Sequence, residues 1–499
     1  MNRWIPVLIL AAAALLRLFA LDLKPPHFDE GVNGWFLDQM TRTGFFHYDP
    51  NNYHGPLHFY ILFLSQTMFG RDLLALRVPL ALTSLATVWL MLRFDRFLDQ
   101  RICWFAAAAM AVSPAFTFYT RYAIHEPELV FFLVLFVFGG AGMWRTGERK
   151  YLWATGLSIT GMILTKETYL VHLVCFALAG VALRVLELLS PSAGEWTLSP
   201  QKWKTRDLIG VVAVSTIAIV FFYSGGFMDF SILHGLYQTF GAWAETGKEG
   251  HGHDKDWWYW LDLMRQYELA SLLGMIAAVC CVRPGTDRLL RYLSIYGIGT
   301  LVAYSLVPYK TPWCIISLLW PFLFTFGAIP LALPDRAWWQ GTTGLALVLL
   351  GASTFQALKL NFRHYTDDAE PYVYVQTYED INKLTAPLSA LTRQDPTNFQ
   401  VVGHMLIGSY HPLPWVLGDF PRIGYYGLDK NPPKFDADFL IVDNTRVAAV
   451  EKKLREIYFR EPFNLRSAQS PATLYLNAAT FLGVYPDRTP EFVPELKAP

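Results

Sequence analysis

Residues 27–60 have the sequence HFDEGVNGWFLDQMTRTGFFHYDPNNYHGPLHFY. This stretch lies between two apolar segments, 5–21 and 73–92, and each is about as long as the roughly 20 residues that cross a bilayer. It begins with the paired carboxylates of Asp29 and Glu30 and ends in a segment rich in histidine and aromatic residues. We therefore expect a polar loop beside a membrane, with the remaining chain as the scaffold that holds it.

The composition is typical of a membrane protein. Hydrophobic residues make up 53% of the 499 residues and charged residues only 16%, whereas a soluble globular chain carries about 25% charged residues. The formal net charge is zero, which argues against nucleic acid as a partner. The five cysteines lie in apolar runs without the spacing of metal ligands, so we interpret them as small buried hydrophobic residues.

The apolar segments predict a mainly α integral membrane protein with about 11 transmembrane helices. The first segment contains a single charge, Arg17, and no small-residue cleavage site follows it, so we expect an uncleaved span and not a signal peptide. The region 151–189 has two interpretations, two short spans or one long span. The predicted spans are 5–21, 73–92, 102–119, 128–144, 151–165, 169–189, 208–224, 269–282, 289–307, 313–333 and 341–360.

Clusters of basic residues set the predicted orientation. Arginine and lysine gather in the loops at 93–101, 145–150, 202–206 and 283–291, and short loops with such an excess face the cytoplasm. We therefore expect a multi-pass protein of the cell (inner) membrane with a cytoplasmic N-terminus. The first outer loop (27–70), the 225–267 loop and the residues after 360 then lie on the outer face.

The last 140 or so residues differ in pattern from the spans. Helix-like stretches at 372–392 and 444–456 alternate with strand-like runs at 399–402, 439–442 and 473–476. We expect a small soluble α/β extracytoplasmic domain over 361–499, after a transmembrane domain over 1–360. The domain contains no glycine-rich phosphate loop and no nucleophile elbow, so we assign it no chemistry.

The polar loop predicts an amphipathic helix. Apolar residues recur at helical spacing from Val32 to Met40, Asp29 is a good N-cap, and Gly44 is a good helix stop. Such a helix is expected to lie in the membrane interface. The structural alternative is that Asp29 only caps the helix.

Three further outer turns carry charged residues at the end of a predicted span. Glu126 follows Arg121 and His125 and precedes Pro127, so it could simply open the next span. Lys166 and Glu167 could form a neutralising pair, or Lys166 could face an anion, and Lys310 could extend to lipid headgroups. Together, however, carboxylates and cations suit one reaction. An acceptor hydroxyl needs a general base, and a phosphate leaving group needs positive charge.

Five short motifs follow one another along the chain: Asp29-Glu30, His54-Gly55-Pro56-Leu57, Glu126-Pro127, Thr165-Lys166 and Lys310-Thr311-Pro312-Trp313. In this order they resemble the motifs of the GT-C superfamily of membrane glycosyltransferases. The resemblance is strongest to the branch with the protein O-mannosyltransferases and the lipid A aminoarabinose transferase, and it covers roughly residues 1–360. A tail segment, 411–415, is similar to a subgroup associated with surface N-glycosylation and with flipping of lipid-linked sugars.

The resemblance implies a GT-C bundle that moves a hexose or pentose from a polyprenyl-phosphate donor to a hydroxyl of a lipid or protein acceptor. It implies a single inverting displacement with Asp29 as general base, assisted by Glu30 and Glu126. It places the donor phosphate near four basic residues, Lys166, Lys310, Arg121 and His54. It allows a divalent metal ion held by Asp29, Glu126 and His125.

Two departures from the pattern concern the donor. His54-Gly55 stands where the branch has Lys-Pro, so a cation is replaced by a titratable histidine. Glu126 stands where the aminoarabinose transferase has aspartate, which changes the reach of the carboxylate. The 225–267 loop could act as a lid, and its His251-Gly252-His253 spacing suggests metal, although we favour a flexible polar loop.

Two other functions are compatible with the sequence. The first is a flippase or flippase-associated protein for lipid-linked sugars, which would need charges along a path through the bilayer; the predicted spans are nearly free of charge apart from Arg17. The second is a binding module with a degenerate transferase core. Two observations together distinguish the three: turnover of the donor by purified protein, and whether a chain that ends near residue 360 keeps activity.

Overall fold

The computed structural model describes residues 4–52, 54–189, 199–249, 253–332, 335–467 and 469–494. The chain forms two compact units. The membrane unit comprises Met1–Leu21 and Gln39–Tyr365, and the C-terminal unit comprises Asp22–Asp38 and Thr366–Pro499. Residues 22–38, which carry Asp29 and Glu30, thus belong with the end of the chain, whereas the sequence placed them with the spans.

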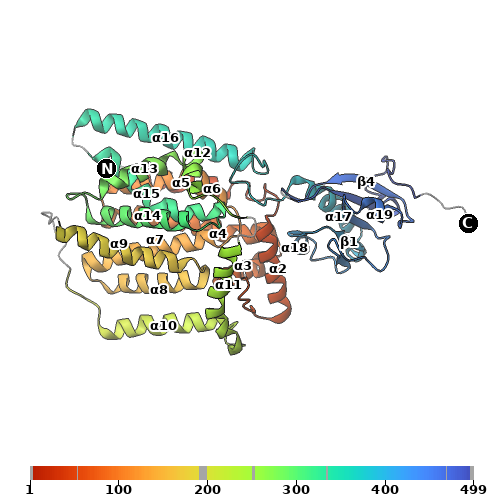
Figure 1. The fold of residues 1–499 in the computed structure, drawn as a ribbon, viewed down its shortest axis with the longest axis horizontal. Helices are drawn as coiled ribbons and strands as arrows, with labels where there is room; N and C mark the ends of the chain where they lie inside the picture. Colours follow the sequence, from red (N-terminus) through yellow and green to blue (C-terminus); the bar gives the residue numbers. More distant parts are fainter. Residues whose placement is uncertain are drawn as a thin grey trace, which may run out of the picture. The chain divides into compact units, whose positions relative to one another are not determined.

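The membrane unit is a bundle of helices, most of which run side by side in Figure 1. The helical stretch Pro312–Leu331, which contains α15, lies at its centre, since 78% of its most apolar residues are buried. Helix α10 lies at the periphery, since only 11% of its most apolar residues are buried. The helices are α1 (Trp4–Leu18), α3 (Leu57–Phe69), α4 (Leu73–Leu92), α5 (Gln100–Val112), α6 (Pro114–Tyr119), α7 (Glu126–Thr146), α8 (Arg149–Thr165), α9 (Tyr169–Leu189), α10 (Thr205–Tyr223), α11 (Gly235–Glu249), α12 (Tyr259–Tyr267), α13 (Leu269–Cys281), α14 (Arg288–Leu306), α15 (Ile315–Ala328) and α16 (Arg336–Phe362).

Seven helical stretches in the described part of the chain are long and apolar enough to cross a membrane. They match the predicted spans at α4, α7, α9, α10, α14, α15 and α16. The other four predicted spans are the shorter helices α1, α8 and α13 and the pair α5–α6. Region 151–189 forms two helices, α8 and α9, which the turn at Lys166 separates.

The span predicted at 102–119 is broken at Ser113. Its hydroxyl oxygen accepts a hydrogen bond from the Phe116 N–H, and Pro114 begins the next helix. The Glu268 carboxylate accepts from the Ser113 hydroxyl at 2.7 Å and from the Ala115 N–H at 2.7 Å. The buried Glu268 carboxyl group thus supplies acceptors at the break, because backbone groups freed inside a membrane protein must find partners.

The polar loop forms the predicted helix, α2 (Phe28–Thr43). Gly44 ends it at a φ of 86°, a conformation that favours glycine. The expected N-cap role of Asp29 is wrong, because the helix begins one residue earlier and Asp29 lies in its first turn. Instead, the Glu30 carboxylate accepts a hydrogen bond from the His27 N–H at 2.8 Å. Residues 28–38 of α2 lie in the C-terminal unit and its last turn lies in the membrane unit.

The C-terminal unit is the predicted α/β domain. Its five strands have the order β2-β1-β3-β5-β4, with β1 parallel to β2 and β3, and β5 antiparallel to β3 and β4. The strand expected at 399–402 is wrong, since β1 begins only at Gly403. The elements are β1 (Gly403–Leu406), β2 (Ile423–Tyr425), β3 (Phe439–Asp443), β4 (Tyr458–Phe463), β5 (Ala472–Asn477), α17 (Asn382–Gln394), α18 (Leu413–Val416), α19 (Val447–Glu451) and α20 (Ala478–Phe481).

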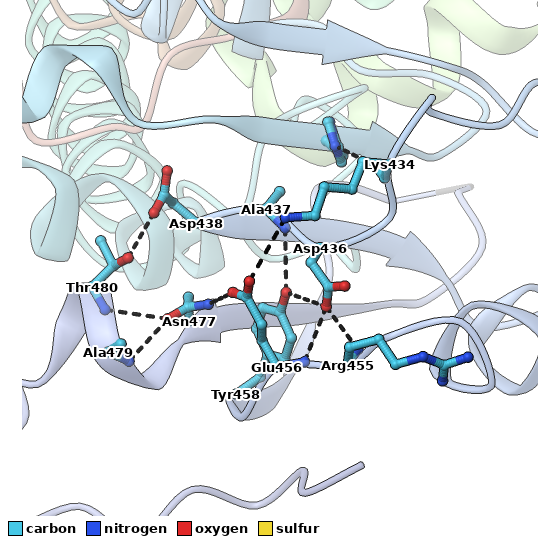
Figure 2. Close-up of polar contacts among 11 residues, drawn as sticks. Lys434, Asp436, Ala437, Asp438, Arg455, Glu456, Tyr458, Asn477, Ala479 and Thr480 are labelled. Carbon is cyan, nitrogen blue, oxygen red and sulfur yellow. Dashed lines mark hydrogen bonds and ion pairs between the residues drawn. The ribbon is translucent and has the colours of Figure 1, made fainter. Parts of the chain in front are cut away.

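Polar side chains tie the edge of this sheet together (Figure 2). Asp436 accepts hydrogen bonds from the Arg455 N–H at 2.8 Å, the Glu456 N–H at 3.1 Å and the Tyr458 hydroxyl at 3.2 Å. Asp438 accepts from the Thr480 hydroxyl at 2.6 Å. These bonds fix the entry to β4, where backbone N–H groups would otherwise lack partners.

Candidate functional site

The His54-Gly55 motif brings a histidine against the end of α8. The Gly55 N–H donates to the Thr165 carbonyl at 3.0 Å, and a Cβ at Gly55 would lie 2.2 Å from the Leu164 carbonyl atoms. Only glycine permits such an approach of two backbones. The approach allows the His54 ring to contact the Glu167 carboxylate, with Nδ1 and Oε2 2.9 Å apart.

The Glu126 and Thr165-Lys166 motifs meet in a buried ion pair. The Lys166 ammonium donates to Glu126 Oε1, and the two side chains are 7% and 3% exposed. Burial alone would lower the pKa of Lys166, but the Glu126 carboxylate, and with it Glu167, holds that pKa well above its usual value. The ammonium therefore stays charged. The Cys314 thiol lies 3.8 Å from the same Glu126 oxygen.

Lys166 and Glu167 are not the pair that the sequence suggested. Lys166 pairs with Glu126, and Glu167 pairs with His54. Burial would raise the pKa of Glu167, but the His54 ring and the Lys166 ammonium outweigh it and lower that pKa below its usual value. Glu167 is therefore ionised at neutral pH.

Three histidine rings pack against one another beside this pair, tilted relative to each other. His125 lies between His54 and His58, with ring centroids 4.4 Å and 4.0 Å away. His58 Nδ1 contacts Glu128 Oε2 at 2.9 Å, and both side chains are at most 2% exposed. Burial and the neighbouring His58, His54 and Lys166 hold the pKa of His125 well below 6.5, so its ring is neutral.

The cluster combines carboxyl groups with atoms that lack hydrogen-bond partners. Glu126, Glu128 and Glu167 place three carboxyl groups around Lys166 and the histidines. Two buried atoms, His125 Nε2 and Glu128 Oε1, have no hydrogen-bond partner among the described residues. Unpaired polar atoms at a buried site are costly, and we take them as the sign of a binding site for a polar group.

Metal binding finds no support in the grouping of side chains. Over the described ranges, no three His, Cys, Asp or Glu side chains are grouped as metal ligands. Glu126 and His125 lie in the cluster, whereas Asp29 belongs to the C-terminal unit. The metal site of Asp29, Glu126 and His125 stays a prediction.

Lys310 secures the end of the predicted lid. Its N–H donates to the His253 carbonyl at 3.0 Å, and its ammonium donates to the carbonyls of Lys255 at 3.1 Å and Val307 at 2.5 Å. Burial lowers the pKa of Lys310, and the carboxylates of Asp256 and Asp254 oppose that shift. The lid segment contains α11 and α12, while His251 lies outside the described residues.

Arg121 caps the C-terminal end of α1. Its guanidinium donates to the carbonyl oxygens of Leu16, Phe19 and Ala20 at 3.1, 2.7 and 2.6 Å. The last carbonyls of a helix lack intrahelical partners and attract cations. This contact gives Arg121 a structural role, and its expected contact with the donor phosphate stays a prediction.

Asp29 and Glu30 lie in a different environment, inside the C-terminal unit. Glu30 is fully buried, and its carboxylate accepts a hydrogen bond from the His27 N–H, whereas the Asp29 side chain is 32% exposed. The Asp29 N–H donates to His27 Nδ1 at 3.2 Å. Of the two carboxylates, Asp29 is thus the one available to a substrate.

Sequence reasoning missed two members of the membrane-unit cluster, His58 and Glu128. A signal was present for Glu128, since Glu126 and Glu128 flank Pro127 at the start of a helix. What the sequence could not show is that His125 stands between the two histidines.

Comparison with known proteins supports the fold. Residues 53–219, about a third of the chain, match the family model described as dolichyl-phosphate-mannose-protein mannosyltransferase. The sequence matches no curated protein at a significant level.

The structure is similar to two crystal structures of ArnT from Cupriavidus metallidurans. The ArnT structure bound to undecaprenyl phosphate aligns with a TM-score of 0.61 at 14% identity, and the apo structure with a TM-score of 0.58 at 14% identity. Each alignment covers 95% of this chain and 98% of ArnT. The chain therefore has the GT-C membrane fold that its five motifs predicted, with the C-terminal α/β domain included.

Proposed function

We propose that the protein is a membrane glycosyltransferase that moves a sugar from a polyprenyl-phosphate donor to an acceptor hydroxyl on the outer face of the membrane. One observation carries the proposal. Three motifs that are far apart in the sequence, at His54, Glu126 and Lys166, meet in one buried cluster of charges within the fold of ArnT. The family-model match over 53–219 contains all three.

The departing phosphate would bind at Lys166. An ammonium has three N–H donors, and the ion pair with Glu126 uses one of them. Positive charge that is already in place where negative charge develops is the main source of catalysis in such a site. His54, a quarter exposed and paired with Glu167, would bind the phosphate in place of the lysine of the related motif. We assign Lys310 to the same phosphate because of the resemblance of its motif; its ammonium donates to the Lys255 carbonyl of the lid segment.

Asp29 would be the general base. A carboxylate that accepts the proton of the acceptor hydroxyl contributes about 10²- to 10⁴-fold to the rate. A single base on the far side of the sugar gives direct displacement, so we expect inversion at the anomeric carbon. Glu30 would act through its bond to His27, which holds the first turn of α2.

The test measures release of polyprenyl phosphate by the purified full-length protein in nanodiscs. A panel of polyprenyl-phosphate hexoses and pentoses is offered, with Asp29→Asn and Lys166→Met as variants. We expect the wild type to release polyprenyl phosphate with one donor and both variants to lose at least a hundredfold in rate. Full activity of Asp29→Asn would refute the base assignment.

The same assay tests the rival function. Movement of a labelled donor between leaflets without release of polyprenyl phosphate would identify a flippase. Arg17, the charge within the first span, is occupied: it donates to the Ala111 carbonyl at 2.8 Å, the Met110 carbonyl at 3.0 Å and the Ser84 hydroxyl at 2.8 Å. Arg17 is therefore engaged in structural hydrogen bonds and does not offer a free charge along a path for a lipid-linked sugar, which supports the transferase function.

A further inference from the structure

The first turns of α2 are in close contact with the segment 409–415 of the same C-terminal unit. A Cβ at Gly31 would lie 2.3 Å from Pro412 Cα, and one at Gly34 would lie 2.4 Å from the Trp415 ring. Residues three apart lie on one helix face. Two glycines on that face therefore let Pro412 and Trp415 pack directly against the backbone that carries Asp29.

Hydrogen bonds fix the residue that precedes this turn. His27 Nδ1 accepts from the Asp29 N–H at 3.2 Å, and His27 Nε2 contacts the Tyr374 carbonyl at 2.9 Å. The Gln376 side-chain amide donates to the Pro25 carbonyl at 3.0 Å, which holds the approach to the helix.

Arg466 adds a cation to the same contact. Its guanidinium lies 4.4 Å from the centroid of the Phe28 ring, donates to the His411 carbonyl at 3.2 Å and donates to the Ser409 hydroxyl. The His411 and Phe28 rings pack edge to face, with their centroids 5.4 Å apart. Burial lowers the pKa of Arg466, and the attraction of the Asp29 carboxylate opposes that shift.

We propose that Arg466 and the segment 409–415 are positioning elements for Asp29 within the C-terminal unit. This inference rests on the proposed function, in which Asp29 is the base. Arg466 and Trp415 act through Asp29 and α2 and do not touch the reacting atoms. A base displaced by about 1 Å costs on the order of 100-fold in rate, which is what loss of these contacts should produce.

The test compares Arg466→Gln and Arg466→Lys with a matched control, Arg488→Gln. Arg488 lies in the same unit, 5.3 Å from the ring centroids of both Phe459 and Tyr485, and pairs with Glu461 and Glu491. We expect Arg466→Gln to lower kcat about tenfold to 100-fold with the KM for the donor unchanged. Arg466→Lys should recover part of kcat, and Arg488→Gln should leave kcat unchanged.

A size exchange tests the glycine contact. Gly34→Ala should lower kcat in the same way, because its methyl group meets Trp415. Trp415→Ala makes room for that methyl group, so the double variant should recover activity relative to Gly34→Ala alone.

Hydrogen exchange of the α2 amides over 28–38 gives a readout that does not depend on turnover. Arg466→Gln and Gly34→Ala should speed this exchange and Arg488→Gln should not. Unchanged exchange and unchanged kcat in Arg466→Gln would overturn the inference. Absence of polyprenyl-phosphate release by the wild type, with faster exchange in the variants, would overturn only the proposed function and retain the contact.

Discussion

The ion pair between Glu126 and Lys166 predicts a large loss of stability when either charge is removed. Removing one partner of a buried pair leaves an uncompensated charge and costs about 3–5 kcal/mol of unfolding free energy. Lys166→Met leaves two carboxylates, Glu126 and Glu167, without the ammonium that faced both, so we expect about 4 kcal/mol. Glu126→Gln leaves Lys166 with Glu167 still facing it, so we expect about 3 kcal/mol.

The double variant gives the decisive number. Glu126→Gln with Lys166→Met removes both charges of the pair and leaves only Glu167 without the ammonium, so its loss should be no larger than that of Lys166→Met alone. We expect a double-mutant loss of about 4 kcal/mol instead of the sum of about 7, which is a coupling energy of about 3 kcal/mol.

Denaturant unfolding in detergent measures this coupling, with reaction of the buried thiols of Cys103 and Cys175 as the signal. The exposed pair Asp262–Arg265, 53% and 71% exposed, is the matched control and should give less than about 1 kcal/mol. A coupling for Glu126–Lys166 as small as that of the control would refute the buried pair.

Three further predictions concern the cluster and the C-terminal unit. Gly55→Ala forces its loop away from Leu164, so it should lose about 1–3 kcal/mol of stability and most transfer activity, whereas Gly140→Ala, where a Cβ meets open space, should lose neither. His125 is neutral when folded but binds a proton readily when unfolded. Stability should therefore fall below pH 6.5, by up to about 1.4 kcal/mol per pH unit, and His125→Asn should reduce this slope in thermal unfolding at a series of pH values. Asp436→Ala leaves two backbone N–H groups without their acceptor, which should cost about 1–2 kcal/mol and speed hydrogen exchange at the start of β4.

The sequence was sufficient for the features that depend on local pattern. Apolar runs located the helices of the bundle, because a membrane core leaves backbone groups no partner except within a helix. Gly44 ended α2 as expected, because the left-handed conformation there suits glycine. Strands β3 and β5 were found because they are fully buried and mostly apolar.

Features that depend on distant contacts were missed. Strand β4 contains Arg460, Glu461 and Pro462, so its sequence lacks the usual strand pattern, and only pairing with β5 reveals it. The partners of Lys166 and Glu167 depend on how α7 and the segment before α3 pack against the end of α8. The spacing of residues in the sequence does not reveal this packing. The grouping of residues 22–38 with a unit that begins more than 300 residues later is likewise a long-range property.

That grouping has a consequence for synthesis of the protein. Residues 22–38 leave the ribosome early, but their packing partners begin at Thr366, 328 residues after Asp38. At about 5–20 residues per second, the segment waits on the order of half a minute for its partners. During this delay Phe28 lacks Arg466 and the 409–415 segment, and the bilayer surface is the natural place for such an aromatic residue. The nascent chain thus carries Asp29 in an unassembled state until translation is nearly complete, which delays any activity of the site until the whole chain has been made.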